Sequence, residues 1–485
     1  MQTWAKTTGR RRAVLLALPA LVIALLAVRD FARLGDQLPW RAMYDFPQFY
    51  CSGAALDEGA SPYTYEPLHA CERRVSTSAL LAANPQMVLP APLPPYDFLP
   101  LRWLAKLDYA SARATMFVAS CAALVGAVVA LAGLGLPADV VVLAFLLSAG
   151  YVDLAAGQIV PIALLFLVLC GSALAARRDA FAGIAATLAA IEPHLALPVV
   201  VVVFVYVKGA RVAMAATAAV LGIVSLSTMG LAQCVTYFTR ILPLQGSAET
   251  SYPFQFSLTY LLNALGIPEA AALAVGAAST LALLGLAVMV APRVAGALER
   301  RELLAFFPAV CGITAGTYMH MVDLCFAIPA ALVFAATLRG RRKVAASLAL
   351  SLLSIPWVWV WSIKKLFLAS IFVAAAILLR LEMPWMVVVP ALLALCGAMY
   401  GLELHPPTLA HALRPSPSAF PADSLSEPAY RVFIEQVRSG DPRWVLVKVP
   451  AWTALVTLLC LAIDVARPAF ERLRVGSAGG RKDAV

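Results

Sequence analysis

The chain consists of apolar runs separated by short polar breaks along almost its whole length. A run of about 20 mainly apolar residues can cross a bilayer as a helix. The runs predict membrane spans near residues 13–28, 114–133, 139–155, 159–176, 180–191, 195–207, 212–229, 269–291, 304–318, 322–338, 344–361, 366–379, 384–401 and 446–466. Several runs are short or contain Pro and Gly, so we expect about 11–14 spanning helices. The pattern therefore predicts an all-α polytopic membrane protein.

The composition supports this class. Of the 485 residues, 62% are apolar and 13% are charged, whereas soluble domains have about 25% charged residues. The net charge is +10, but the basic residues fall in short clusters beside apolar runs. This placement is typical of membrane topology rather than of a nucleic-acid-binding face. We therefore expect membrane lipids as partners and no nucleic acid.

The basic clusters also predict the orientation. Most of them, from Arg10–Arg12 to the tail at 467–482, fall on one side of the predicted spans, and Lys364 with Lys365 is the exception. The positive-inside rule makes that side the cytoplasm, which places both termini inside. No convincing A-x-A cleavage site follows the first run, so we expect a retained helix. High Ala and Arg usage without a eukaryotic sorting signal predicts a bacterial inner membrane.

Three long connections then lie on the outer, periplasmic side: 29–113, 230–268 and 402–445. The third is rich in Pro and Ser and is predicted to form a loop or lid. We divide the chain into a transmembrane unit at 1–401, the outer loop at 402–445, and a last span with a basic tail at 446–485.

The nine cysteines have no metal-ligand spacing, and most sit singly in apolar runs. Cys51 and Cys71 share the first outer connection. They can pair if that connection faces an oxidising compartment, and the spacing alone leaves this open.

Polar groups gather where several predicted spans reach the outer face. An ionisable residue within a span costs roughly 2.5–3.5 kcal/mol, so such groups usually face protein or water and often mark function. Four separate parts of the chain bring these groups to one level: Tyr44 and Asp45; Asp153, Gly157 and Gln158; Glu192 to His194; and Tyr318, His320 and Asp323. We expect them to line one cavity.

Each of these residues also has a plain structural explanation. Asp45 can cap a helix that begins at Phe46. His194 can be a neutral interfacial histidine, Glu192 can pair with a cation, and Gln158 can satisfy a helix end. Position along the chain does not decide between these roles and a functional site.

The order of the polar motifs carries a family resemblance. Tyr44-Asp45-Phe46 comes first, and "SPYTYEP", "PLPPYDFLPL", "GQIVPIALLFLVL", "EPHLALPVVVVVF" and "GTYMHMVDLCFAIPAAL" follow. Over roughly residues 10 to 340 this order resembles the GT-C glycosyltransferases of family 87, of the polyprenyl-phosphate-mannose-dependent α-1,2-mannosyltransferase type. The resemblance implies a GT-C-like helical bundle with a periplasmic loop region after its first helix.

The resemblance also implies residue roles. The family's Asp after the first span acts as catalytic base and corresponds to Asp45. Its Gly-Gln turn corresponds to Gln158, the His after Pro to His194, and a later outer-face His to His320. Where a basic residue is expected before the Pro, this chain has Glu192, and "TAGTYM" replaces the Ser-Pro and Trp that usually precede the later His. Donor or acceptor can therefore differ from the mannose-type members.

Sugar transfer of this kind requires few catalytic groups. A carboxylate within hydrogen-bond reach can take the proton of an acceptor hydroxyl as it attacks the anomeric carbon, with inversion. Hydrogen-bond donors stabilise the leaving lipid phosphate. We expect Asp45 as base, with substrate contacts from Tyr44, Tyr96, Arg102, Gln158, Glu192, His194 and His320. The donor carries a single phosphate, so no metal and no cofactor is expected.

Two other classes remain open. A secondary transporter or flippase of a polar or lipid-linked substrate predicts charged residues at mid-span and paired inverted halves, and neither is evident here. A structural membrane subunit would leave the outer polar groups scattered in space. The absence of Walker A and dinucleotide-binding glycine patterns leaves ATP-driven transport and nicotinamide chemistry unsupported.

Overall fold

The computed structural model describes residues 25–76, 81, 84–314, 316–408, 420–438 and 441–479. Helices are the only regular elements of these residues, and the two β-bridges, Thr64 with Leu425 and Gln255 with His320, are isolated. The all-α prediction is confirmed. Most of the predicted first span, the cluster Arg10–Arg12 and the end of the basic tail lie outside the described residues.

The helices fall into three groups along the chain. The first outer connection contains η1 (Gly35–Gln37), α2 (Pro39–Ala42), α3 (Phe46–Asp57), α4 (Tyr65–Val75), η2 (Pro95–Asp97) and α6 (Phe98–Leu104). The apolar body contains α7 (Tyr109–Gly133), α8 (Ala138–Leu146), η3 (Ser148–Asp153), α9 (Leu154–Ala156), α10 (Val160–Ala175), α11 (Asp179–Leu188), η4 (Ala189–Ile191), α12 (Pro193–Tyr206), η5 (Lys208–Ala210), α13 (Arg211–Thr236), η6 (Tyr237–Ile241), α14 (Leu242–Glu249), α15 (Leu258–Ala264), α16 (Glu269–Leu298), α17 (Leu303–Thr314), η7 (Met321–Ala327), α18 (Ile328–Thr337), α19 (Gly340–Leu353), α20 (Trp357–Ser362), η8 (Lys364–Leu366), α21 (Phe367–Arg380) and α22 (Trp385–Leu404). The last group is α23 (Glu427–Val437), α24 (Arg443–Leu446) and α25 (Val449–Gly479).

Length and apolar composition make five of the described helices candidates to cross a membrane, or six if the pair α8 and η3–α9, bent by 47°, counts as one broken span. The five are Tyr109–Gly133, Lys208–Glu249, Glu269–Leu298, Trp385–Leu404 and Val449–Pro468. Six shorter apolar helices of 10–17 residues accompany them. The polytopic class is therefore confirmed, and the predicted number of spans is reached only if the shorter helices are counted.

The shorter helices end where the sequence breaks the helical pattern. The predicted span at 344–361 is divided at Pro356 into α19 and α20, because proline cannot continue the hydrogen-bond pattern of the preceding helix. Likewise, the predicted span at 322–338 begins as the 3₁₀ turn η7 before α18 continues it. A window of apolar residues marks buried segments well but does not reveal such interruptions.

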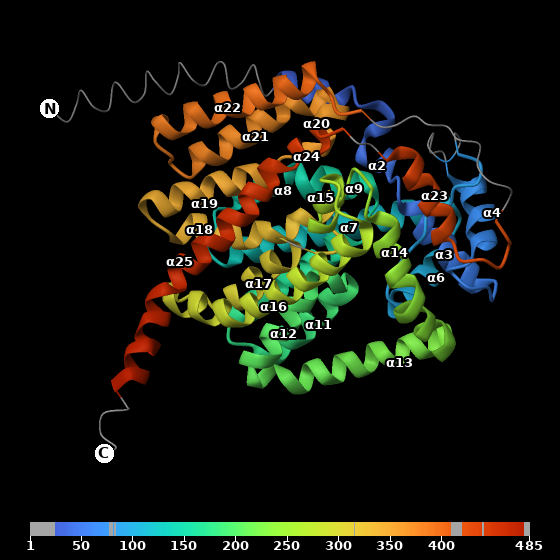
Figure 1. Ribbon diagram of the computed structural model, residues 1–485, viewed down its shortest axis with the longest axis horizontal. Helices are drawn as coiled ribbons and strands as arrows, with labels where there is room; N and C mark the ends of the chain where they lie inside the picture. Colours follow the sequence, from blue (N-terminus) through green and yellow to red (C-terminus); the bar gives the residue numbers. More distant parts are fainter. Residues whose placement is uncertain are drawn as a thin grey trace.

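Helix α17 lies at the centre of the apolar body, where it packs against α10, α12 and α16. Its Phe306 and Phe307 are fully buried. Gly171 of α10 permits the close approach of α10 and α17, because a β-carbon there would lie 2.3 Å from the ring of Phe306. Figure 1 shows the remaining helices around this centre, with α13 along one edge, α21 and α22 at the opposite edge, and α25 crossing the bundle.

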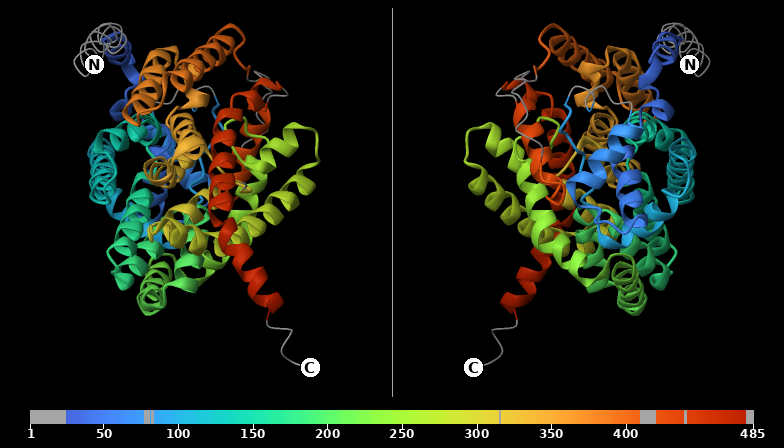
Figure 2. Two further views of the ribbon diagram at one scale, coloured as in Figure 1. Left: turned by 90° about the vertical axis from the view of Figure 1, so that its left-hand side faces the viewer. Right: turned by 90° about the vertical axis from the view of Figure 1, so that its right-hand side faces the viewer.

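The outer elements gather on one side of the bundle. Helices α3, α4, α6 and α23 lie together there, although α23 comes more than 300 residues after α6 in the chain (Figures 1 and 2). The segment 402–445, predicted as an outer loop, thus contributes helix α23 to this side. Backbone hydrogen bonds attach it to the first outer connection, with Tyr65 N–H donating to the carbonyl of Ser424 and Ser426 N–H to that of Tyr63.

Candidate active site

A cavity of about 660 Å³ opens between the outer elements and the apolar body. Asp45, Gln158, His194 and His320 all line it. They come from four places: the turn before α3, the turn between α9 and α10, the first turn of α12, and the residue before η7. Tyr44 and Glu192 also line it. The structure therefore brings together residues that lie up to 276 positions apart in the chain.

Asp45 is held beside Gln158 by a close contact between two turns. The Gln158 Nε2 donates to Asp45 Oδ2 at 2.6 Å, and the backbone N–H of Asp45 donates to the carbonyl of Ala156 at 2.7 Å. Gly157 makes the contact possible, since it has φ +77° and an added β-carbon would lie 3.1 Å from the Cα of Met43. Glycine is the residue that accepts both this dihedral angle and this proximity without strain.

The helix-capping explanation for Asp45 is wrong in one respect. Asp45 occupies the N-cap position of α3, but its side chain makes no capping hydrogen bond. The carboxylate turns to Gln158 and the cavity instead and stays partly exposed. Burial raises the pKa of the Asp45 carboxyl above its ordinary value, and the hydrogen bond from Gln158 opposes part of that rise. A carboxylate with a raised pKa is a better proton acceptor.

His194 lies between two carboxylates. Its Nδ1 is 3.6 Å from Glu192 Oε2 and its Nε2 is 3.5 Å from Asp323 Oδ2. Burial raises the pKa of Glu192 to about 7, and His194 partly opposes this rise. The structure thus places the neighbouring histidine beside Glu192, rather than a cation from elsewhere at the interface.

His320 stands at the edge of a second polar group that sequence reasoning missed. Gln255 Nε2 lies 2.9 Å from His320 Nε2 and donates to Glu249 Oε2 at 3.0 Å. Glu249 Oε1 accepts from Tyr430 Oη at 2.6 Å and from Gln245 Nε2 at 3.2 Å. Glu249 and Gln255 lie in the connection 230–268 and Tyr430 in the connection 402–445. Both connections were predicted to be outer, but their polar residues were not linked to the site.

Two predicted substrate-binding residues lie elsewhere. Arg102 is half-exposed on α6 and its Nε donates to Asp57 Oδ1 at 3.1 Å, so its charge is engaged at the surface. The hydroxyl of Tyr96 donates to the backbone carbonyl of Ala190. Neither residue lines the cavity. Asp153 is buried behind the cavity wall, where its Oδ2 accepts from the thiol of Cys325 at 3.5 Å.

The charge of the cavity wall differs from that of a typical phosphate-binding site. Four carboxylates, Asp45, Glu192, Glu249 and Asp323, and two histidines line it. Among the described residues no lysine or arginine does. No group of three or more His, Cys, Asp or Glu side chains suited to a metal ion occurs in the described part of the chain. Among the described residues of this wall, the two imidazoles are therefore the groups that can carry a positive charge.

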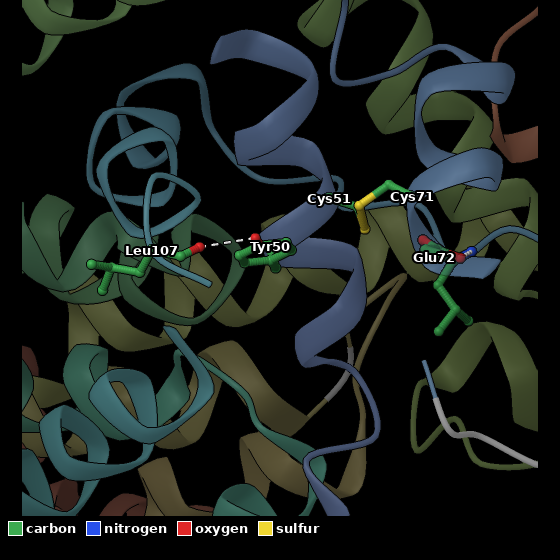
Figure 3. The surroundings of a disulfide bond; sticks show 6 residues. Tyr50, Cys51, Cys71, Glu72 and Leu107 are labelled. Atoms are coloured by element: carbon green, nitrogen blue, oxygen red, sulfur yellow. Dashed lines mark hydrogen bonds between the residues drawn. A yellow bond between two sulfur atoms is a disulfide. The ribbon is translucent and has the colours of Figure 1, made fainter. Parts of the chain in front are cut away.

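A disulfide bond braces the outer connection that carries Asp45. Cys51 of α3 is bonded to Cys71 of α4. The spacing alone left open whether these two cysteines pair, and the structure shows that they do. Figure 3 shows two further contacts beside it. The Tyr50 hydroxyl donates to the Leu107 carbonyl at 3.0 Å, and Glu72 Oε2 accepts from the Leu89 N–H at 3.0 Å. Helix α3, which directly follows Asp45, is thus fixed on both sides.

Comparison with known families supports one class of protein. The model of glycosyltransferase family 87 matches residues 93–322. The match covers 230 of the 485 residues, and over this segment the chain is similar to glycosyltransferase family 87. Comparison with curated proteins and with solved structures finds no match. Together with the apolar helices, this match supports a membrane glycosyltransferase.

The family 87 match covers some residues of the cavity wall and not others. It contains Gln158, Glu192, His194 and His320, but it begins after Asp45. The geometry of Asp45 is therefore an observation independent of the match. Its contact with Gln158 connects it to the matched segment.

Proposed function

We propose that this membrane glycosyltransferase transfers a sugar from a polyprenyl-phosphate donor to a lipid or glycan acceptor at the outer face of the cytoplasmic membrane. The sugar is a mannose-like hexose or a pentose. The observation that carries the proposal is the Asp45 carboxylate, which faces a cavity shared with two histidines and accepts a single side-chain hydrogen bond, from Gln158.

In this proposal Asp45 is the general base. The acceptor hydroxyl attacks the anomeric carbon, a new C–O bond forms, and Asp45 takes the hydroxyl proton through the oxygen that Gln158 does not occupy. The bond between the anomeric carbon and the phosphate oxygen breaks, and the electron pair leaves with the lipid phosphate. A single displacement of this kind inverts the anomeric centre, and a positioned base contributes about 10²–10⁴-fold to the rate.

His194 and His320 are the proposed donors to the leaving phosphate. Their imidazoles can give N–H groups to phosphate oxygens as negative charge develops there. Glu192 and Asp323 flank His194 and favour its cationic form. Gln158, predicted to bind substrate, acts in this proposal by orienting Asp45. The apolar part of the cavity wall, with Leu93, Val152 and Leu242, suits the first isoprene units of the donor.

The proposed location is a bacterial inner membrane with the site facing the periplasm. The predicted topology places the first connection outside. The bond between Cys51 and Cys71 supports this side, because disulfides persist in oxidising compartments and are rare in the cytosol. No cofactor is proposed beyond the lipid-linked donor. The expected partners are membrane lipids, the donor and the acceptor, without nucleic acid.

The test is sugar transfer by the full chain in membrane vesicles. Polyprenyl-phosphate mannose and a polyprenyl-phosphate pentose, each radiolabelled, are supplied as donors, and label entering lipid and glycan fractions is measured. Transfer from one donor that is lost in Asp45→Asn supports the proposal, and nuclear magnetic resonance of the product checks inversion. Absence of transfer from both donors, or near-normal transfer by Asp45→Asn, overturns it.

A further inference from the structure

We infer that Gln255 is a positioning residue for the transfer reaction, since its buried carboxamide fixes His320 and Glu249 at the cavity wall. The inference rests on the proposed function and goes beyond it, because neither the family resemblance nor the sequence pattern assigns Gln255 a role. Gln255 lies in the connection before α15 and has no exposed surface.

The orientation of the carboxamide follows from its partners. Gln255 Oε1 accepts from the backbone N–H of Met319 at 2.8 Å. A backbone N–H can only donate, so this end of the amide is the oxygen and the other end is the NH₂ group. The NH₂ group lies 3.0 Å from Glu249 Oε2 and 2.9 Å from His320 Nε2. Each of its two hydrogens therefore has an acceptor.

This arrangement sets the state of the imidazole. If Gln255 donates to His320 Nε2, that nitrogen acts as the acceptor and carries no hydrogen. The ring is also held against the wall by Tyr318, whose ring centroid lies 4.9 Å away. Gln255 thus determines both where the imidazole lies and which nitrogen is engaged behind the wall.

Other titratable groups face the same imidazole. Glu249 of α14 has Oε2 at 3.7 Å from His320 Nε2, and Asp323 of η7 accepts from the backbone N–H of His320 at 2.7 Å. Tyr252 lies beside the ring, with centroids 6.1 Å apart, and Asp45 lines the same cavity. Gln255 is the neutral group between His320 and Glu249. Without it, the carboxylate is the nearest partner of the imidazole.

The backbone around Gln255 does not need the carboxamide to keep its course. Gln255 and His320 form an isolated antiparallel bridge, and the Phe256 N–H donates to the Met319 carbonyl at 2.7 Å. These backbone contacts remain when the side chain is changed. A buried apolar residue of similar size can therefore replace Gln255 with the fold retained, while leaving the Met319 N–H and the Glu249 carboxylate each without one partner.

The experiment measures transfer from radiolabelled polyprenyl-phosphate mannose, or from the pentose donor if that one is used, to the acceptors of the native membrane. Full-length wild type, Gln255→Leu, Gln255→Glu and Asp45→Asn are compared across the pH range. Gln233→Leu is the matched control, because Gln233 lies on α13 and contacts Ser61, away from the cavity. The thermal unfolding midpoint of each detergent-purified variant reports folding.

Gln255→Leu is expected to lower kcat by about 10- to 10²-fold with little change in the KM for donor, since a misplacement of about 1 Å costs a comparable factor. Gln255→Glu is expected to gain activity as the pH falls, because a protonated carboxyl can again donate one hydrogen bond. Wild type and Gln233→Leu lack this gain. A purely structural role would lower the yield of folded protein without this new pH dependence.

Several results overturn the inference. Folded Gln255→Leu with activity within about twofold of wild type does so, as does Gln255→Glu with the pH profile of wild type. If wild type transfers sugar and Asp45→Asn does not, either of these results rejects the role of Gln255 alone. If wild type transfers no sugar, the proposed function fails and the inference fails with it.

Discussion

Asp45 and Glu249 are both carboxylates of the same cavity, but they differ in exposure and in the number of hydrogen bonds that they accept. Asp45 is partly exposed and accepts one side-chain hydrogen bond, from Gln158. Glu249 is 2% exposed and accepts hydrogen bonds from Gln245, Gln255 and Tyr430. One carboxylate keeps an oxygen available to a ligand, and the other is occupied on both oxygens.

This difference indicates which of several carboxylates can act as the general base. A carboxylate has about four lone-pair positions, and one already saturated by protein donors cannot approach an acceptor hydroxyl without losing them. Glu249 therefore suits a positioning role that joins α14, α23 and the segment around His320. Asp45 suits proton transfer. The predictions below test this contrast.

The largest effect is expected for Asp45→Asn. Removal of the base lowers the transfer rate by about 10²–10⁴-fold. Stability changes little, because an asparagine oxygen still accepts from Gln158. Initial rates in vesicles and the thermal unfolding midpoint measure the two quantities. Asp57→Asn is the control, as Asp57 pairs with Arg102 at the surface. A small rate loss in Asp45→Asn, matched by Asp57→Asn, would contradict the contrast.

Gly157→Ala tests whether the turn contact holds Asp45 in place. The added β-carbon meets Met43 at 3.1 Å and the residue must keep φ +77°, which costs an L-residue about 1–2 kcal/mol. We expect the Met43–Phe46 turn to shift and activity to fall by about 10- to 10²-fold. Gly135→Ala is the matched control, since it also has positive φ but an added β-carbon there meets nothing within 4 Å. Equal activity losses in the two variants would show that proximity to Asp45 is irrelevant.

Glu249→Gln is expected to lower stability more than the transfer rate, whereas Asp45→Asn is expected to lower the rate and leave stability almost unchanged. A carboxamide NH₂ at this position faces another donor, whether Gln255, Gln245 or Tyr430, so at least one hydrogen bond is lost. We expect a loss of about 1–3 kcal/mol in stability and at most about tenfold in rate. The unfolding midpoint and the transfer rate check this. A rate loss as large as that of Asp45→Asn, with unchanged stability, would make Glu249 the better candidate for the base.

The smallest effect concerns Glu192. Its pKa is raised to about 7 by burial, so it is neutral below that pH and ionised above it. The ionised form favours cationic His194, and we expect wild-type activity to rise by about two- to threefold as the pH increases through 7. Glu192→Gln should lack this rise while keeping the loss of activity in acid that protonation of Asp45 causes. Identical pH–rate profiles for the two proteins would remove Glu192 from the leaving-group side.

The sequence determined the class of this protein because membrane insertion depends on local composition. Apolar runs, the scarcity of charge and the order of the polar motifs each act over a few to about 20 residues. The same local signals indicated that Asp45, Gln158, His194 and His320 would gather at the outer face. These signals could not distinguish Arg102, which has the right residue type but points to Asp57.

The tertiary structure alone decided which groups touch. Glu249 and Tyr430 are 181 residues apart, and Asp45 and Gln158 are 113 apart. No sequence period relates such pairs, because their contact results from the packing of whole helices. The same packing turned Asp45 from a helix cap toward the cavity and brought Cys51 to Cys71. Local chemistry therefore determined which residues were available for catalysis, and the fold determined how each one is used.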